Sequence, residues 1–250
     1  MNGAFRWGLP ESASTYAPEI DFGISLIHWA MVAIFVLWGV FFAYLLVRYQ
    51  RREGVPAEYK HEGIWKSMIP DAIVLIFEIG LIVFYAIPGW GRIKIHFPKP
   101  EDSNTMEVVA EQFAWNVQYP GPDGKFGGRD PKFIDSTNVL GLDPEDPAGK
   151  DDIATLNEMK VPLGKPSLLT LSSKDVIHSF FIPAFRIKQD SVPGMRIPVW
   201  FEPTKEGTYE IGCAQLCGIG HANMRGDVQV LTDEAFQAWL KEQAAAKATQ

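Results

Sequence analysis

Two long apolar runs lie in the first third of the chain. From residue 24 to residue 47 every position except Ser25 and His28 is apolar or small, and a second run covers Met68–Ile87. A helix over the first run is about 36 Å long, enough to cross a bilayer core of about 30 Å. The first run is also too long for the apolar core of a signal peptide. We therefore predict a transmembrane helical hairpin over residues 24–91, with a loop at about residues 50–64.

Charge around these runs predicts their orientation. The short connection between them is rich in Arg and Lys. The charged residues of the N-terminal tail, residues 1–23, are mostly acidic. Cytoplasmic loops carry an excess of basic residues. We therefore expect the loop in the cytoplasm, both termini on the outer side, and the soluble part in the periplasm or its equivalent.

The second apolar run contains two acidic residues, Asp71 and Glu78. Ionisable groups at membrane depth are costly and usually have a role. Asp71 follows Pro70 near the expected cytoplasmic end, so its side chain could also simply reach the interface. Glu78 lies in the middle of the run and shares a helix face with Asp71. A lone hairpin offers little to pair with them, so we expect a larger membrane complex.

The remainder of the chain alternates strand-like segments with turn signals. Residues 92–232 are expected to form one all-β domain, an antiparallel sandwich or barrel, interrupted by a polar insertion over residues 121–160. Residues 233–250 are expected to form a C-terminal helix and tail, with acidic residues in its first turn. The segments with strand character are Met106–Tyr119, Ser167–Ile182, Ile197–Phe201, Gly207–Cys213 and Gly226–Leu231.

Composition excludes several classes of protein. Eight Trp and sixteen Phe give ample core material, so the chain is not disordered. Two Cys in 250 residues cannot staple a disulfide scaffold. A net charge of −7 argues against nucleic acid as a partner.

A cluster of soft ligands near the C-terminus carries the candidate chemistry. Cys213, Cys217, His221 and Met224 follow the spacing C-x3-C-x3-H-x2-M, and His178 stands upstream at the end of a predicted strand. Thiolate, imidazole and thioether together favour copper. Three other interpretations stay open at this point: a Cys213–Cys217 disulfide, a tetrahedral zinc site formed by both Cys and both His, and Met224 as a core residue.

The segment Cys213–Met224, together with Asp175–Ser179 and Lys188–Gly194, resembles subunit II of a bacterial cytochrome c oxidase. The resemblance implies a cupredoxin-like Greek-key domain with a binuclear copper centre, CuA. Cys213 and Cys217 would bridge the two coppers, His178 and His221 would each cap one, and Met224 and the carbonyl of Gln215 would complete the set. Asp175 and Asp190 would support these ligands.

The same resemblance implies a function. The subunit would accept electrons from a cytochrome c-type donor and pass them to haem in subunit I, where O2 is reduced and protons are translocated. Its partners would be subunit I, subunit III, the donor and membrane lipid. Two alternatives stay open: the CuA subunit of a nitric oxide reductase, and a membrane-tethered module that binds copper or zinc.

Two departures from the family pattern affect these expectations. Gln215 stands where the family has the Glu that helps to hold Mg²⁺ at the subunit I boundary, which leaves that ion in doubt. Phe113 replaces a Trp at the expected point of electron transfer from the donor, next to Trp115, although both could be ordinary sheet residues. Glu62 matches the family's carboxylate at the mouth of a proton pathway.

Acidic residues in the segment 101–160 form a further candidate surface. They could steer a basic donor toward the domain, or they could belong to a solvated loop. The residues concerned are Glu107, Glu111, Asp123, Asp143, Glu145 and Asp146.

Overall fold

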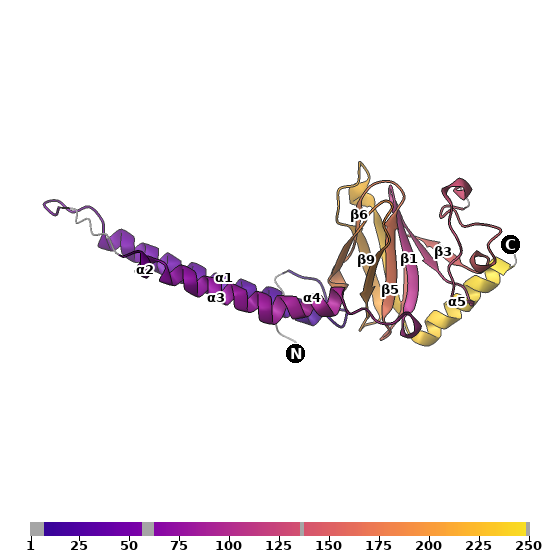
Figure 1. The fold of residues 1–250 in the computed structure, drawn as a ribbon, viewed down its shortest axis with the longest axis horizontal. Helices are drawn as coiled ribbons and strands as arrows, with labels where there is room; N and C mark the ends of the chain where they lie inside the picture. Colours follow the sequence, from indigo (N-terminus) through magenta and orange to yellow (C-terminus); the bar gives the residue numbers. More distant parts are fainter. Residues whose placement is uncertain (1–7, 57–62, 136–137, 249–250) are drawn as a thin grey trace. The chain divides into compact units, whose positions relative to one another are not determined.

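The computed structural model describes residues 8–56, 63–135 and 138–248 (Figure 1). The described chain divides into two compact units. One unit is helical and comprises residues 19–96. The other comprises residues 97–250 together with residues 8–18.

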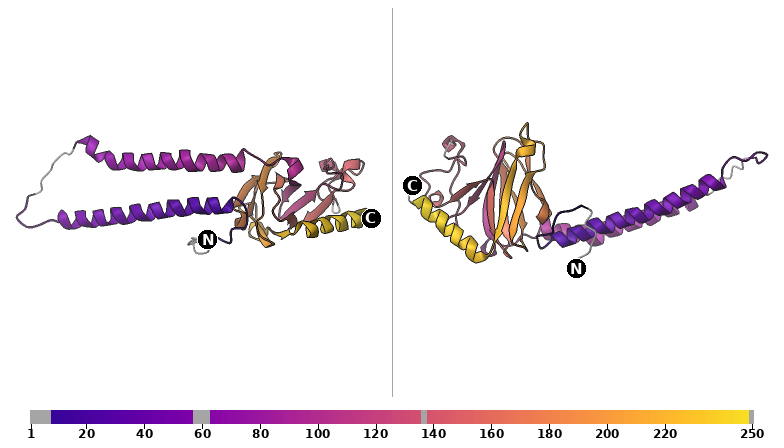
Figure 2. Two further views of the ribbon diagram at one scale, coloured as in Figure 1. Left: turned by 90° about the horizontal axis from the view of Figure 1, so that it is seen from below. Right: turned by 180° about the vertical axis from the view of Figure 1, so that it is seen from behind.

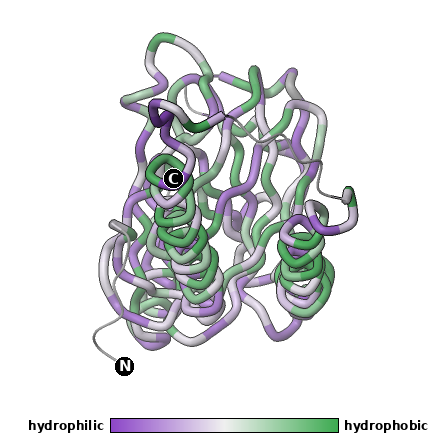
Figure 3. The backbone as a smooth tube through the Cα atoms, turned by 90° about the vertical axis from the view of Figure 1, so that its left-hand side faces the viewer, coloured by the Kyte–Doolittle hydropathy of each residue, from purple (hydrophilic) through white to green (hydrophobic). Residues whose placement is uncertain are grey.

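The helical unit consists of two apolar rods. Helix α1 covers Ala17–Arg48, so it begins seven residues before the apolar run itself. The second rod starts with the single turn α2 (Ile64–Ser67), followed by α3 (Ile69–Leu81), the π-helical turn η1 (Ile82–Ala86) and α4 (Ile87–Lys94). Both rods are long and apolar enough to cross a membrane, and the chain itself buries neither. Their turns are largely green, the hydrophobic colour, in Figure 3.

The two rods are joined near the N-terminal end of α1. The Tyr85 hydroxyl donates a hydrogen bond to the carbonyl of Glu19, and Arg92 forms an ion pair with the Glu19 side chain. A Cβ atom at Gly23 would lie 2.6 Å from the Tyr85 ring, so glycine at this position permits the close approach. Tyr85 lies within the π-helical turn, which locally changes the helical register.

The β unit is a sandwich of two five-stranded sheets (Figures 1 and 2). The first sheet has the order β3-β2-β1-β5-β8 and the second the order β4-β10-β9-β6-β7. The strands of the first sheet are β1 (Asn104–Glu111), β2 (Ala114–Tyr119), β3 (Ile153–Leu156), β5 (Ser167–Ser173) and β8 (Ile197–Phe201). Those of the second are β4 (Glu158–Pro162), β6 (His178–Ile182), β7 (Ile187–Ser191), β9 (Gly207–Cys213) and β10 (Arg225–Leu231).

The chain crosses between the sheets after β3, β4, β5, β7 and β8, as in a Greek key. The predicted all-β sandwich with its C-terminal helix, α5 (Asp233–Ala248), is therefore confirmed. The sheets are mixed, however, because β1 pairs with β5 and β4 pairs with β10 in parallel. The expectation of a purely antiparallel domain was wrong, since strands brought together by sheet crossings need not alternate in direction.

Two segments expected as single strands each form two. Met106–Tyr119 turns back on itself at Gln112 and Phe113, so that β1 and β2 pair as a hairpin. Ser167–Ile182 bends between β5 and β6 and passes from one sheet to the other. Both turns matter for the site, because they bring Phe113 and His178 to the same end of the sandwich as the Cys213–Met224 loop.

Aromatic residues fill the space between the sheets. Trp115 of β2 is fully buried and meets Phe180 of β6 edge-to-face, with ring centroids 5.4 Å apart. At the other end, Tyr119 of β2 packs edge-to-face on Trp239 of α5, with ring centroids 5.1 Å apart. The helix thereby covers the end of the sandwich that lies away from the Cys213–Met224 loop.

The segment 121–160 contains more structure than a polar insertion would. It includes β3, and β4 begins within it. The buried Asp152 side chain accepts hydrogen bonds from Gln118 Nε2 at 2.5 Å and from the Gly127 N–H at 2.8 Å. Lys247 of α5 donates to the carbonyls of Gly149 and Asp152. These contacts attach the segment to β2 and to the C-terminal helix.

Residues ahead of α1 also belong to the β unit. Ala13 N–H donates to the Ala184 carbonyl at 2.9 Å, and Thr204 N–H donates to the Ala13 carbonyl at 2.9 Å. The Ser14 hydroxyl donates to the Phe185 carbonyl, and both Ala13 and Ser14 are buried. The described part of the N-terminal tail is therefore packed on the sandwich.

Candidate metal centre

His178 is the first residue of β6 and is fully buried. Its Nε2 lies 2.9 Å from Asp175 Oδ1, and its Nδ1 lies 3.1 Å from Met224 Sδ. A carboxylate on one ring nitrogen fixes the proton there and leaves the other nitrogen free to bind a metal. Nδ1 is thus the His178 atom available to a metal, and it faces Met224 and Cys213 of the Cys213–Met224 loop.

Asp175 is itself held in place from three sides. It accepts hydrogen bonds from the backbone N–H groups of Gln112 and Val176, each at 2.7 Å, besides its contact with His178. Burial acts to raise the pKa of this carboxyl, but the hydrogen bonds from His178, Gln112 and Val176 outweigh it, so the pKa lies below its usual value. Asp175 therefore remains a carboxylate that orients the imidazole.

The remaining ligand candidates come from the loop between β9 and β10. Cys213 is the last residue of β9, and the loop is tied to β6 by the Ala214 N–H, which donates to the Ser179 carbonyl at 3.0 Å. Gly218 has φ of +134°, a conformation that L side chains rarely adopt. A short 3-10 turn, η6 (His221–Asn223), then returns the chain to β10.

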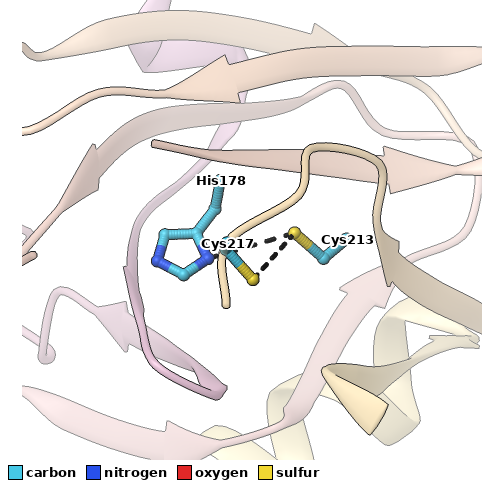
Figure 4. Close-up of side chains that lie close together, drawn as sticks. All are labelled: His178, Cys213 and Cys217. Carbon is cyan, nitrogen blue, oxygen red and sulfur yellow. Dashed lines mark hydrogen bonds between the residues drawn. The ribbon is translucent and has the colours of Figure 1, made fainter. Parts of the chain in front are cut away.

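The loop folds so that its donor atoms converge. Cys213 Sγ lies 3.8 Å from Cys217 Sγ and 3.1 Å from the Gln215 carbonyl oxygen. Cys217 Sγ lies 3.6 Å from His221 Nδ1 and 3.9 Å from Met224 Sδ. Figure 4 shows the two sulfurs and the His178 ring directed at one another. The structure thus brings all six predicted copper ligands to one place.

This geometry distinguishes the interpretations left open by the sequence. Both thiols are free, with their sulfurs too far apart for a bond, so a Cys213–Cys217 disulfide is not formed. Met224 is buried, yet its sulfur meets His178 and Cys217 rather than apolar neighbours alone. Its sulfur therefore lies among the other candidate donor atoms, as a ligand would.

A single tetrahedral ion accounts poorly for the whole set. His178, Cys213 and Cys217 offer donor atoms within 4.8 Å of one another. His221 stands outside that set and approaches Cys217. Met224 lies beside His178, and the Gln215 carbonyl lies beside Cys213. The set therefore contains more donors than the four that a structural zinc ion usually binds.

The thiols need a cation to ionise together. Burial, with hydrogen bonding and charge from Cys213, raises the pKa of Cys217 to about 11. Adjacent thiolates repel each other in a partly buried site. Metal binding would therefore displace protons from this pair, as thiolate sites in general require. The residues present thus fit a soft cationic metal group.

The turn between β1 and β2 covers the loop. A Cβ at Gly220 would lie 2.4 Å from the Phe113 ring, so this half-buried ring packs directly on the loop backbone. Trp115 is fully buried behind it, edge-to-face with His178 at 6.2 Å between centroids. A docked protein could therefore touch Phe113 but not Trp115, so Phe113 alone of this pair is a candidate for direct contact with a donor.

Asp190 is differently placed from Asp175. It is exposed on β7 and opposite Ser179, whereas His178 is opposite Ser191. Because neighbouring positions of a strand point to opposite faces, Asp190 and His178 point away from each other. The structure therefore gives no contact through which Asp190 could support the ligands in the way Asp175 does.

The magnesium expectation finds little support in this chain. The Gln215 side chain is exposed and carries no charge. Among the residues that the structure describes, His178, Cys213 and Cys217 form the one cluster of three such metal-ligating side chains. The chain by itself therefore does not supply a carboxylate cluster for Mg²⁺ beside Gln215.

Two acidic residues expected as surface charges are paired with basic side chains, Glu107 as a buried residue and Glu111 as a half-buried one. Glu107 is 3% exposed and forms ion pairs with Arg129 and Arg196. Glu111 is paired with Lys174 at 2.7 Å. Neither is available to steer a donor, so the acidic surface is smaller than the sequence indicated.

The membrane-depth acids share one groove. Asp71 and Glu78 both line a groove of about 700 Å³ between α1 and α3, whose other walls are apolar and include Ala30, Ala33 and Trp38. Their predicted common face is thus the face toward α1. Glu62, expected at a proton pathway, lies outside the described residues.

Sequence reasoning missed three residues near the loop. Gln112 donates its side-chain amide to the Cys217 carbonyl at 2.6 Å. Leu216 and Ile219 are exposed, Ile219 completely, although they are large and apolar. Two large apolar residues in an otherwise small and polar loop were the available signal for a contact surface.

Known proteins resemble this chain over most of its length. The family described as "Cytochrome C oxidase subunit II, periplasmic domain" matches residues 105–231. An alternative cytochrome c oxidase subunit 2 of Bradyrhizobium diazoefficiens is 34% identical, over 90% of this chain and 80% of the relative. A cytochrome c oxidase subunit 2 of Cereibacter sphaeroides is 32% identical, over 94% and 79%.

A solved structure gives a further comparison. The periplasmic domain of subunit II of cytochrome oxidase from Bradyrhizobium japonicum is 30% identical, with a TM-score of 0.45, and the match covers 60% of this chain and 99% of that domain. The family match spans half the chain, and the Bradyrhizobium diazoefficiens and Cereibacter sphaeroides relatives extend it to nearly all of it. The resemblance inferred from the copper-ligand residues is therefore confirmed: the chain belongs to the cytochrome c oxidase subunit II family.

Proposed function

We propose that this chain is the electron-accepting subunit of a haem–copper terminal oxidase and holds a binuclear copper centre, CuA. The chain would take electrons one at a time from a cytochrome c-type donor and deliver them to haem in the partner subunit I. Relatives named as cytochrome c oxidase subunit 2 support the oxidase over a nitric oxide reductase.

One observation carries this proposal: two free thiols 3.8 Å apart lie between two different sets of donors. His178 and Met224 approach from one side, and His221 approaches Cys217. The Gln215 carbonyl completes the set at Cys213. This is the ligand set that two thiolate-bridged coppers require, and every donor is soft or borderline except one carbonyl.

The chain's own residues hold this set in one geometry. When bound, two thiolate-bridged coppers carry one electron shared between them. Asp175 fixes the His178 ring, and η6 presents His221 while it returns Met224 to the buried side. Ligands fixed from outside move little when the charge changes, and hydrogen bonding around them tunes the potential. Transfer of single electrons needs no open coordination position, so the domain would need no small substrate.

The donor would dock over Phe113. This ring lies on the glycines of the metal loop and retains partial exposure. Ile219, fully exposed between those glycines, extends the apolar surface. An apolar contact of this kind would bring the donor close to the coppers and would not require ion pairs at the point of contact.

Orientation is supported by packing as well as by charge. Residues 8–18 pack on the sandwich, so the N-terminal segment and the β-domain must lie on the same side of the membrane. Two spans returning to the starting side agree with this. The basic connection between them would then face the cytoplasm, and the β-domain the periplasm of a bacterial inner membrane.

A partner helix would fill the groove that contains Asp71 and Glu78. A polar group in an apolar groove is stabilised by hydrogen bonding to a neighbouring helix. We expect Glu78→Leu to reduce co-purification of the haem-bearing subunit several-fold. Phe84→Leu, an exposed residue of the same rod that does not line the groove, serves as the control. Equal recovery with both variants would contradict the pairing.

Metal analysis with EPR tests the copper proposal. The full chain, purified in detergent and loaded with copper, should hold two coppers and give the signal of one electron shared by both. A single zinc ion at saturation, or a signal from one isolated copper, would contradict it. Ready loss of metal to a weak chelator would instead favour a delivery module.

A further inference from the structure

We infer that Gln112 is a positioning residue of the metal centre, which locks the loop carrying Cys217 against the strand end carrying His178. The inference rests on the proposed copper function and adds to it a residue that is not itself a ligand. Its two contacts reach both halves of the ligand set.

The first contact is on the loop side. Gln112 Nε2 donates to the Cys217 carbonyl oxygen at 2.6 Å. The Sγ atom of the same residue lies near Cys213 Sγ and near His221 Nδ1. Fixing the peptide plane after Cys217 fixes the direction from which its Sγ approaches the metals.

The second contact is on the strand side. The Gln112 backbone N–H donates to Asp175 Oδ2 at 2.7 Å, while Asp175 Oδ1 holds His178 Nε2. One residue therefore connects the Cys217 loop and the His178 imidazole, which lie 39 positions apart in the sequence. Since the backbone contact survives any side-chain change except proline, the two connections can be tested separately.

The loop backbone is shaped around this residue. A Cβ at Gly218 would lie 2.8 Å from Gln112 Nε2 and 3.2 Å from Phe113. Gly218 also adopts φ of +134°. Glycine is thus required at this position twice, for its conformation and for the approach of Gln112.

Because Gln112 is exposed, its effect on the metal centre can be distinguished from an effect on the stability of the whole domain. Its side chain adds little to the buried core, so removing the amide costs the domain about the folding free energy of one hydrogen bond. What is lost is the restraint on the loop. We therefore expect an effect on the metal centre that is larger than the effect on unfolding.

The experiment compares Gln112→Leu with the control Gln237→Leu in the copper-loaded full chain. Gln237 is exposed on α5, at the end of the sandwich away from the loop. Gln112→Leu should lose copper to a competing Cu(I) chelator about tenfold faster than wild type, the scale of one hydrogen bond. Its EPR hyperfine pattern should change, while its melting temperature stays near that of the control.

A third variant, Gln112→Lys, keeps a nitrogen donor within reach of the Cys217 carbonyl. It should restore slow copper loss and most of the wild-type EPR pattern. If Gln112→Leu matches wild type in both readouts, or Gln112→Lys behaves like Gln112→Leu, the inference is overturned. If the wild-type chain holds no binuclear centre, the proposed function itself fails, which is a distinguishable result.

Discussion

Two aspartates at opposite ends of one sandwich show how differently the same side chain is used. At the metal end, Asp175 accepts hydrogen bonds from His178, Gln112 and Val176, and these hold its pKa below the usual value despite burial. At the end covered by α5, Asp152 is 1% exposed, and burial raises its pKa in spite of contacts from Gly127 and Gln118. Asp152 Oδ1 is left without a hydrogen-bond partner among the described residues.

The difference lies in where the donors come from. The β5–β6 turn and the Gln112 turn present N–H groups directly to Asp175, and the imidazole adds a third donor. Around Asp152 the unpartnered Gln118 Oε1 is another acceptor, which cannot help a carboxylate. The surroundings of Asp175 therefore stabilise its carboxylate, whereas those of Asp152 make its ionisation unfavourable.

The largest expected effect is at the metal end. Cys217→Ser should abolish the binuclear centre while leaving the sandwich folded, because a hydroxyl is a poor ligand for copper and cannot bridge as thiolate does. Cys213→Ser should act equally, since each thiol contacts the other. Copper analysis and EPR measure this; a shared-electron signal surviving either change would refute the assignment.

Asp175→Asn should follow in size. The amide keeps the shape of the carboxylate but orients His178 weakly, and loss of such a partner commonly lowers metal affinity about 10- to 100-fold. Competition with a Cu(I) chelator measures the change. Asp190→Asn is the control, because Asp190 is exposed and faces away from His178. An equal effect of both variants would remove the distinction drawn for Asp175.

Phe113→Ala should alter electron transfer more than it alters the centre. Removing the ring uncovers the loop glycines and takes away the proposed donor contact, so turnover at limiting donor should fall several-fold. Leu156→Ala, an exposed apolar residue on β3, is the matched control. Unchanged turnover at limiting cytochrome c would contradict this role, whatever the copper spectrum does.

The smallest effect is expected at Asp152, at the end of the sandwich covered by α5. There the substitution should stabilise the protein, whereas the substitutions at the metal end should impair it. Because the folded-state pKa of Asp152 is raised, the folded state loses stability as pH rises from the ordinary value of 3.8 through the raised one. Asp152→Asn removes that ionisation and adds a donor for Gln118 Oε1. At neutral pH it should raise the unfolding free energy of the β-domain by about 1 kcal/mol.

Denaturation at about pH 4 and at neutral pH checks this sign. The variant should lose less stability than wild type over that interval, while Asp123→Asn, an exposed position, should follow wild type. A variant that is less stable than wild type at neutral pH would show that the Asp152 carboxylate is satisfied after all.

Local pattern predicted the elements well where the signal was continuous. The apolar run marked α1, yet the helix starts earlier, at Ala17, because residues without strong hydropathy can extend a helix. Strand segments were located, but the turn at Gln112 was missed, because residues 106–119 have strand character throughout and contain no Gly or Pro to mark a turn. The parallel pair of β1 with β5 could not be predicted, because register and direction depend on contacts distant in sequence.

For the site, residue types and spacing determined five ligand side chains and their preference for a soft metal, because ligand chemistry belongs to the side chains themselves. The Gln215 carbonyl was expected only from the family resemblance. Folding alone decided that the sulfurs remain apart, that His178 presents Nδ1 through Asp175, and that Gln112 joins strand to loop. Folding also buried Trp115 and directed Asp190 away from His178. Such facts arise from packing between segments far apart in the chain, and one-dimensional order does not encode the distances that packing creates.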